Sequence, residues 1–219
     1  MTFAHLPARA PASNDPVVDW LLDTDPSIRW QVMRDLTDTS AEVVAAERSR
    51  VASEGWGARL LDQQRPDGQW GDGVATPFWW SNMYTLAFLR DLQAFGATSA
   101  VTDARRRAEG YLLERRLLGR LSTGDIIDLL WTQFAFPPLW HYDVLRALDY
   151  LRAAGVQPDG QVQEAVAIVL ERRQGDGRWL LDVRHRDTLH EELAGAVGEP
   201  NRWVTLRARR LLDWYARRD

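Results

Sequence analysis

A short turn sequence occurs twice in this chain of 219 residues, and it limits the folds that the chain can adopt. The first copy is Gln64–Trp70 (QRPDGQW) and the second is Arg173–Trp179 (RQGDGRW). Each copy follows an amphipathic helical pattern and places Asp-Gly two residues before its Trp. Glycine reaches positive φ without a Cβ clash, and Trp offers a large flat surface that can cover the end of the preceding helix. The repeated turn therefore predicts helices joined in hairpins.

A second repeat lies within the helical patterns. An aromatic residue, a variable residue, a β-branched residue, Leu or Met, and then Arg recur at Trp30–Arg34, Tyr142–Arg146 and Trp203–Arg207. The segment Phe78–Phe95 is apolar around most of its girth, as an enclosed helix would be, whereas Ser99–Arg116 has a charged side. We expect an all-α protein of about four helical hairpins, arranged as an α/α toroid or an open horseshoe.

Proline, glycine and capping residues divide the chain into elements. Residues 1–15 are rich in Ala and Pro and predict a flexible N-terminal arm, whereas residues 16–219 predict a single helical-repeat domain. Asp25, Ser40 and Asn201 each precede a helical pattern and are expected to cap its first turn. In the helix after Ser40, we expect the inward-facing side chains to be Val43, Val44 and Val51.

Composition excludes several classes of function. The chain has no Cys, which rules out disulfides, thiolate metal ligands and a cysteine nucleophile. A net charge of −4 argues against a nucleic-acid binder, and no apolar run reaches the ~18 residues needed to span a bilayer. We therefore expect a cytoplasmic protein without a metal, a cofactor or a transmembrane segment.

The Gln64–Trp70 turn resembles the Gln-x-x-x-Gly-x-Trp repeat of the squalene–hopene cyclase and protein prenyltransferase β-subunit superfamily. The resemblance implies a squalene-cyclase-like toroid in which Gln64 bonds across the turn and stacks on Trp70. It implies a weaker version of that contact for Arg173 and Trp179. The residues of this structural motif are Gln64, Gly68, Trp70, Gly177 and Trp179.

The catalytic signatures of that superfamily are absent. The cyclases protonate an alkene with an Asp-x-Asp-Asp motif, and the nearest string here, Asp23–Pro26, lacks the last Asp and uses Asp25 as a cap. The prenyltransferase zinc site needs a Cys. We therefore expect the toroid to bind an apolar or aromatic small molecule, for example a terpenoid, and leave catalysis open.

Aromatic residues near the starts of the enclosed helices are the candidate ligand-binding residues. We expect them to share one concave surface. They are Trp80, Tyr84, Trp131, Trp140, Tyr142 and Trp203.

Asp143 and His141 are the candidate catalytic residues. Both lie in the first turn of the apolar helix expected over Leu139–Ala154, where Asp143 could act as a base and His141 as its neighbour. The alternative is an acid favoured by the helix dipole beside a rim histidine. Asp125 and Asp128 form a second pair, for which the alternative is a helix cap with a first-turn acid.

A non-enzymatic protein is the main alternative function. Asp25 and Pro26, followed by an apolar stripe, would also suit the first helix of a HEAT-like repeat that binds a protein or peptide. The sequence leaves room for a homodimer. Metal-capable side chains in the expected loop Leu180–Pro200 lack the spacing of a zinc-binding helix, so we expect them to be solvated. They are His185, His190 and Glu191.

Overall fold

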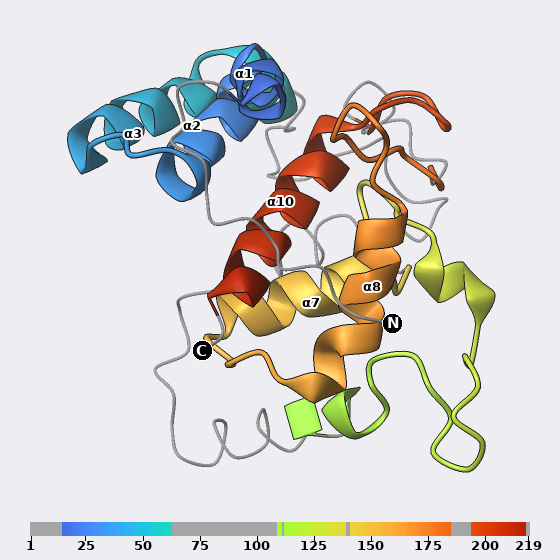
Figure 1. The fold of residues 1–219 in the computed structure, drawn as a ribbon. Helices are drawn as coiled ribbons and strands as arrows, with labels where there is room; N and C mark the ends of the chain where they lie inside the picture. Colours follow the sequence, from blue (N-terminus) through green and yellow to red (C-terminus); the bar gives the residue numbers. More distant parts are fainter. Residues whose placement is uncertain (1–14, 63–108, 111, 139–140, 185–193, 218–219) are drawn as a thin grey trace, which may run out of the picture.

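The structure is a computed structural model and is mainly helical (Figure 1). It describes residues 15–62, 109–110, 112–138, 141–184 and 194–217. The α-helices in these ranges are α1 (Pro16–Leu22), α2 (Pro26–Leu36), α3 (Ala41–Ser49), α4 (Gly55–Asp62), α7 (Val144–Ala153), α8 (Gln163–Glu171) and α10 (Arg202–Ala216). Short 3₁₀ helices are η2 (Arg50–Ala52), η3 (Leu129–Thr132) and η4 (Gly160–Val162). Within the described ranges, β-pairing is confined to isolated bridges, so the all-α expectation is confirmed.

The expected helix caps are confirmed. The side chains of Asp25, Ser40 and Asn201 accept hydrogen bonds from first-turn backbone N–H groups at 2.8, 3.5 and 3.0 Å. Asp15 also caps a helix, because its carboxylate accepts from the backbone N–H of Val17 at 2.9 Å. Helix α1 therefore begins at Pro16, and residues 1–14 of the predicted arm lie outside the described residues.

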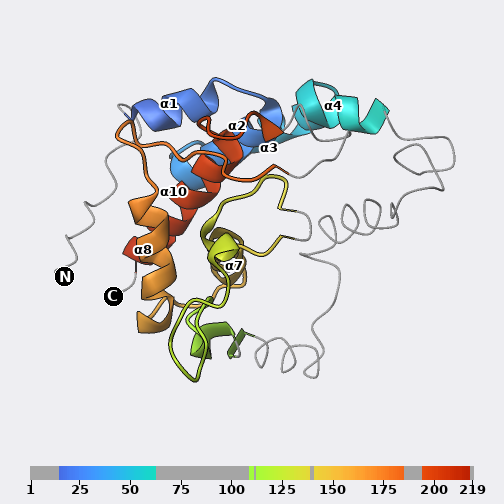
Figure 2. The same cartoon turned by 90° about the vertical axis from the view of Figure 1, so that its right-hand side faces the viewer.

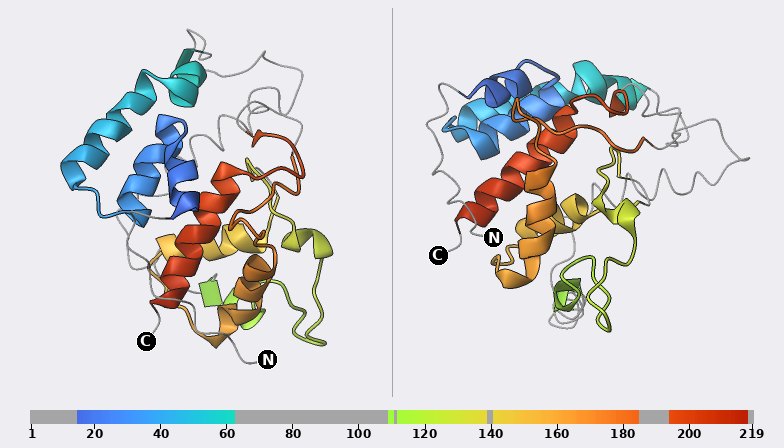
Figure 3. Two further views of the ribbon diagram at one scale, coloured as in Figure 1. Left: turned by 45° about the horizontal axis from the view of Figure 1, so that its top comes forward. Right: turned by 45° about the vertical axis from the view of Figure 1, so that its right-hand side comes forward.

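Helix α10 runs between two hydrophobic cores (Figure 2). The smaller core is built from α1 and α2, and Leu206 of α10 completes it. The larger core is built mainly from α7, α8 and the inner face of α10 (Figure 3). Burying apolar area contributes roughly 25 cal/mol per Å², so α10 stabilises both cores at once.

The three copies of the five-residue repeat lie on α2, across the start of α7 and on α10. Its β-branched members, Val32, Val144 and Thr205, are all fully buried. Helix α10 packs against α7 on one side and against α2 on the other. The aromatic member behaves differently in the first copy, because the guanidinium groups of Arg34 and Arg48 lie over the ring of Trp30 at 4.7 and 5.0 Å.

The second copy of the turn forms the contacts that its residues predict. Gly177 has a φ of +81°, and Trp179 is fully buried and donates from Nε1 to the carbonyl of Val169 in the last turn of α8 at 2.7 Å. The guanidinium of Arg173 lies 5.9 Å from the centroid of the Trp179 ring. The backbone N–H of Trp179 donates to Thr205 Oγ1 at 3.1 Å, so the turn ties α8 to α10. The first copy, with Gln64, Gly68 and Trp70, lies outside the described residues.

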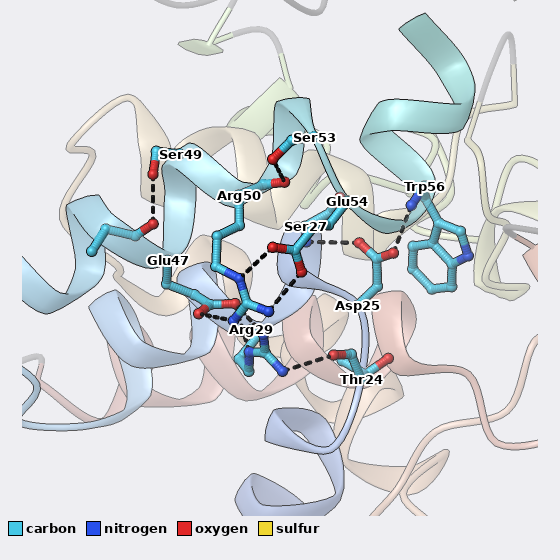
Figure 4. A network of polar contacts seen from close by, with 11 residues as sticks. Thr24, Asp25, Ser27, Arg29, Glu47, Ser49, Arg50, Ser53, Glu54 and Trp56 are labelled. Carbon is cyan, nitrogen blue, oxygen red and sulfur yellow. Dashed lines mark hydrogen bonds and ion pairs between the residues drawn. The ribbon is translucent and has the colours of Figure 1, made fainter. Parts of the chain in front are cut away.

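Asp25 joins two helices (Figure 4). One carboxylate oxygen caps α2 through Ser27, and the other accepts the backbone N–H of Trp56 in α4 at 2.6 Å. Gly55 has a φ of +63°, and a Cβ at this position would overlap the Asp25 carboxylate. Two helices therefore depend on one side chain and on one residue that lacks a Cβ.

Two details of the expected helices are wrong. The helix predicted over Leu139–Ala154 begins at Val144, with Asp143 as its cap, so His141 and Tyr142 precede the helix. Val43 does not face inward, since it is 51% exposed. Its helix, α3, packs along one narrow side on α2, and two successive valines cannot both lie on that side.

Gly177→Ala should destabilise the protein by about 1–2 kcal/mol. The alanine would have to keep a left-handed conformation, and its Cβ would lie 2.9 Å from Val17 Cγ2. Gly175→Ala is the matched control in the same turn, because a Cβ there meets no atom within 4 Å. Thermal or urea unfolding measures both variants. Equal effects would contradict a special role for Gly177.

Asp25→Ala should cost about 2 kcal/mol, roughly twice the ordinary loss of one helix cap, because two backbone N–H groups lose their acceptor. Ser40→Ala removes one longer, exposed cap and should cost less than about 1 kcal/mol. Urea unfolding measures both. An Asp25→Ala protein no less stable than Ser40→Ala would show that the Trp56 contact contributes nothing.

Candidate functional site

Asp143 is fully buried, and its carboxylate is bonded to the backbone on both sides. One oxygen accepts the N–H of Arg146 at 2.7 Å and thereby caps α7. The other accepts the N–H of Ala135 at 3.4 Å, in the segment that leads into the helix. The side chain therefore fixes the segment around Ala135 to the start of α7.

Burial raises the pKa of Asp143, because a carboxylate loses hydration in an apolar environment. The charge of Arg207, the two backbone N–H groups and His141 lower the pKa but do not cancel the effect of burial.

His141 lies beside Asp143 in the chain but contacts the backbone. Its Nε2 is 3.3 Å from the carbonyl oxygen of Gln133. Its own carbonyl accepts a hydrogen bond from Arg146 Nη1 at 3.0 Å. Asp143 thus accepts hydrogen bonds from main-chain N–H groups, and the His141 ring lies against a main-chain carbonyl.

Tyr142 and Trp131 form one aromatic pair. Their ring centroids are 4.9 Å apart in an edge-to-face arrangement, and both rings are half-buried against the larger core. Tyr142 donates its hydroxyl hydrogen to the carbonyl of Leu117 at 2.6 Å. Burial raises the pKa of Tyr142, so its hydroxyl stays protonated and acts as a donor at neutral pH.

Trp203 belongs to a different aromatic group, which we call the aromatic cluster: Trp56, Phe136 and Trp203. The rings of Phe136 and Trp203 are stacked, with centroids 4.8 Å apart and planes 6° from parallel. Trp56 lies 6.0 Å from Trp203 at a tilt of 30°. All three side chains are half-buried. The cluster joins three segments that are distant in sequence: α4, the segment before α7, and α10.

The indole N–H of Trp203 makes no hydrogen bond to any residue that the structure describes, although the Nε1 atom is buried. A buried N–H without an acceptor is costly, and in folded proteins the acceptor is then often water or a ligand. The cluster therefore combines flat apolar faces with one unused donor.

Several predicted site residues cannot be placed. Among the predicted ligand-binding residues, Trp131, Tyr142 and Trp203 are described and fall into the two aromatic groups above. Asp128 caps η3 by accepting from Leu130 at 2.9 Å, so of the second candidate pair Asp128 has a capping role. The predicted residues outside the described part are Trp80, Tyr84, Trp140, His185, His190 and Glu191.

Sequence reasoning missed Trp56 and Phe136. Trp56 lies between Gly55 and Gly57, which together indicate a break between helices, and Phe136 precedes two prolines. A large aromatic side chain beside each break was the available signal, because such residues commonly seal gaps between helices.

No cluster of three or more metal-capable side chains occurs among the described residues. In the same part of the chain, every helix is too short or too polar to span a bilayer. Comparison of the whole chain with protein-family models, curated proteins and solved structures found no match. The resemblance to the squalene cyclase superfamily therefore stays a prediction.

Asp143→Asn should change how stability depends on pH. Because the carboxyl has a higher pKa when folded, the folded protein binds more protons than the unfolded chain above about pH 4. The contribution of Asp143 to stability therefore falls as the pH rises through its folded pKa, and the amide does not titrate. Relative to the wild type, the variant should gain in melting temperature between about pH 4 and pH 7.

Asp128→Asn is the control, because Asp128 caps η3 at the surface. A melting-temperature difference between Asp143→Asn and the wild type that is flat from pH 4 to 7, or a parallel trend in the control, would contradict the effect of burial at Asp143.

Proposed function

We propose that this protein binds an apolar or aromatic small molecule, for example a terpenoid, against the aromatic cluster Trp56, Phe136 and Trp203. The observation that carries the proposal is the buried indole N–H of Trp203, which has no acceptor among the described residues. Stacked, half-buried rings provide apolar contact, and one directed donor beside them provides orientation. The preferred ligand is a flat or apolar molecule with one hydrogen-bond acceptor.

We further propose that the helices belong to an α/α toroid or open horseshoe of the squalene-cyclase type. Helix α10 carries the last copy of the five-residue repeat and packs against α7, which carries the preceding described copy, and against α2, which carries the first. This arrangement supports a series of hairpins whose last member returns to the first.

We assign Asp143 a structural role in this proposal. Both of its oxygens accept backbone N–H groups, and the side chain has no exposed surface on which to meet a substrate. A general base must reach the proton that it removes. Binding therefore has better support than catalysis.

The test is a titration of the full chain with farnesol and with 2-naphthol, measured by calorimetry and tryptophan fluorescence. Both probes should bind saturably, since both are apolar and carry an acceptor oxygen. Trp203→Phe keeps the aromatic face but removes the donor, so it should weaken binding about tenfold, or ~1.4 kcal/mol.

Trp30→Phe is the matched control, because the ring of Trp30 lies between two arginines on α2 and α3. The control should bind both probes as the wild type does. The proposal fails if neither probe binds saturably, or if the Trp203 and Trp30 variants bind equally well.

A second candidate is a HEAT-like module that binds a protein or a second copy of the chain. The observation that favours it is the packing of α1 on α2 and of α2 on α3, in sequence order. Light scattering over a range of protein concentrations tests for a homodimer. A dimeric mass, together with no saturable binding of farnesol or 2-naphthol, would favour this candidate over the first.

A further inference from the structure

Six charged side chains meet where α2, α7 and α10 converge, and we call them the arginine cluster. They are Arg34 and Asp35 on α2, Asp149 and Arg152 on α7, and Arg207 and Arg210 on α10. Helix α10, which lies between α2 and α7 (Figure 1), carries the two arginines that join the two sides of the cluster.

Two of the arginines are deeply buried. Arg207 is 9% exposed and Arg210 is 7% exposed. Arg210 pairs with Asp35 and donates from Nη1 to Gln31 Oε1 at 3.0 Å. Arg207 Nε lies 3.5 Å from Asp149 Oδ2. Each buried guanidinium therefore has one carboxylate within ion-pair distance, and the charge of Arg207 also acts on the buried carboxyl of Asp143.

These partners leave donors unused. Arg207 Nη1 and Arg210 Nε are buried and make no hydrogen bond to any described residue. A guanidinium has five N–H donors in a fixed plane, and burying them without acceptors costs free energy. The unused donors indicate that an acceptor is missing from this place.

The charges are also unbalanced. Each carboxylate is shared by two arginines, since Asp35 also bonds Arg34 at 2.7 Å and Asp149 also bonds Arg152 at 3.0 Å. The side chains joined by these contacts therefore carry a net charge of +2.

The electrostatic environment of the Arg210–Asp35 pair keeps both side chains charged at neutral pH. Burial lowers the pKa of Arg210 to about 10, although Asp35 and Asp149 oppose the shift. Burial would raise the pKa of Asp35, but Arg34 and Arg210 lower it, so this carboxylate stays charged.

The cluster is open to solvent at one side. The side chain of Arg34 is 47% exposed, and that of Arg152 is 24% exposed. A small anion could therefore meet the rim arginines first and place its oxygens towards the buried donors.

We propose that the arginine cluster binds a phosphate group. Near neutral pH a phosphate group carries a charge of about −1.5 to −2 and three acceptor oxygens, which matches the surplus charge and the unused donors. Guanidinium groups suit phosphate because two parallel N–H groups can meet two oxygens. The phosphate group belongs either to free phosphate or to a phosphate monoester.

The experiment is calorimetric titration of the full chain with inorganic phosphate and with glycerol 3-phosphate, at constant ionic strength set with sodium chloride. Phosphate should bind saturably and raise the melting temperature above that in chloride alone. Equal affinities would identify free phosphate as the ligand. An affinity about tenfold higher for the ester would identify a larger phosphorylated molecule.

Variants at the rim make the experiment specific. Arg152→Gln and Arg34→Gln should each weaken phosphate binding about tenfold while the protein stays folded, because both side chains are partly exposed.

Arg209→Gln is the matched control on the same helix, because Arg209 pairs with Asp15 instead of with the cluster. It should bind phosphate as the wild type does, and so should Trp203→Phe, which separates this site from the aromatic cluster. The proposal is overturned if phosphate and chloride stabilise the protein equally, or if the two rim variants bind phosphate with wild-type affinity.

Discussion

The packing of α10 against both α2 and α7 is the interaction on which the rest of the structure depends. Leu206 completes the core of the first two helices, while Ala208 and Leu211 belong to the core of α7 and α8. The side of α10 between these surfaces carries Arg207 and Arg210. One helix therefore supplies two apolar contacts and one charged contact, and the apolar and charged contacts depend differently on salt and temperature.

The aromatic cluster and the arginine cluster differ in their chemistry because they use side chains from different turns of α10. Near its start, α10 presents Trp203 to other aromatic rings. One to two turns later it presents two guanidinium groups to carboxylates. A ligand that used both places would need an apolar body and an anionic group, whereas separate ligands would need only one of these features each.

Much of the local structure could be predicted from sequence, because helix caps and the turn after α8 depend on residues that are close in the chain. Asp25 and Asn201 are examples, since each accepts a backbone N–H within three residues, and Gly177 donates its N–H to the carbonyl of Gln174. The start of α7 was placed too early because Leu139 and Trp140 extend the apolar pattern, and the cap at Asp143 outweighs that pattern.

The candidate sites were harder to predict, because they depend on contacts between distant parts of the chain. Trp203 was selected for its place in a repeat, but its partners Trp56 and Phe136 adjoin breaks between helices, where periodicity gives no signal. The charged residues of α10 look like an ordinary solvated face in the sequence. Their burial follows from α2, which is held against α10 by contacts such as that of Arg210 with Gln31, 179 residues away.

The place of Leu206 in the first core has a consequence for synthesis of the chain. The ribosome completes α1 and α2 long before α10, and Asp15 meets its partner Arg209 only across 194 residues. During translation, Val17, Leu21 and Ile28 therefore lack their contact with Leu206 until α10 has been synthesised. The first core can therefore be completed only after α10 has been made, so the final packing of α1 and α2 depends on the last helix of the chain.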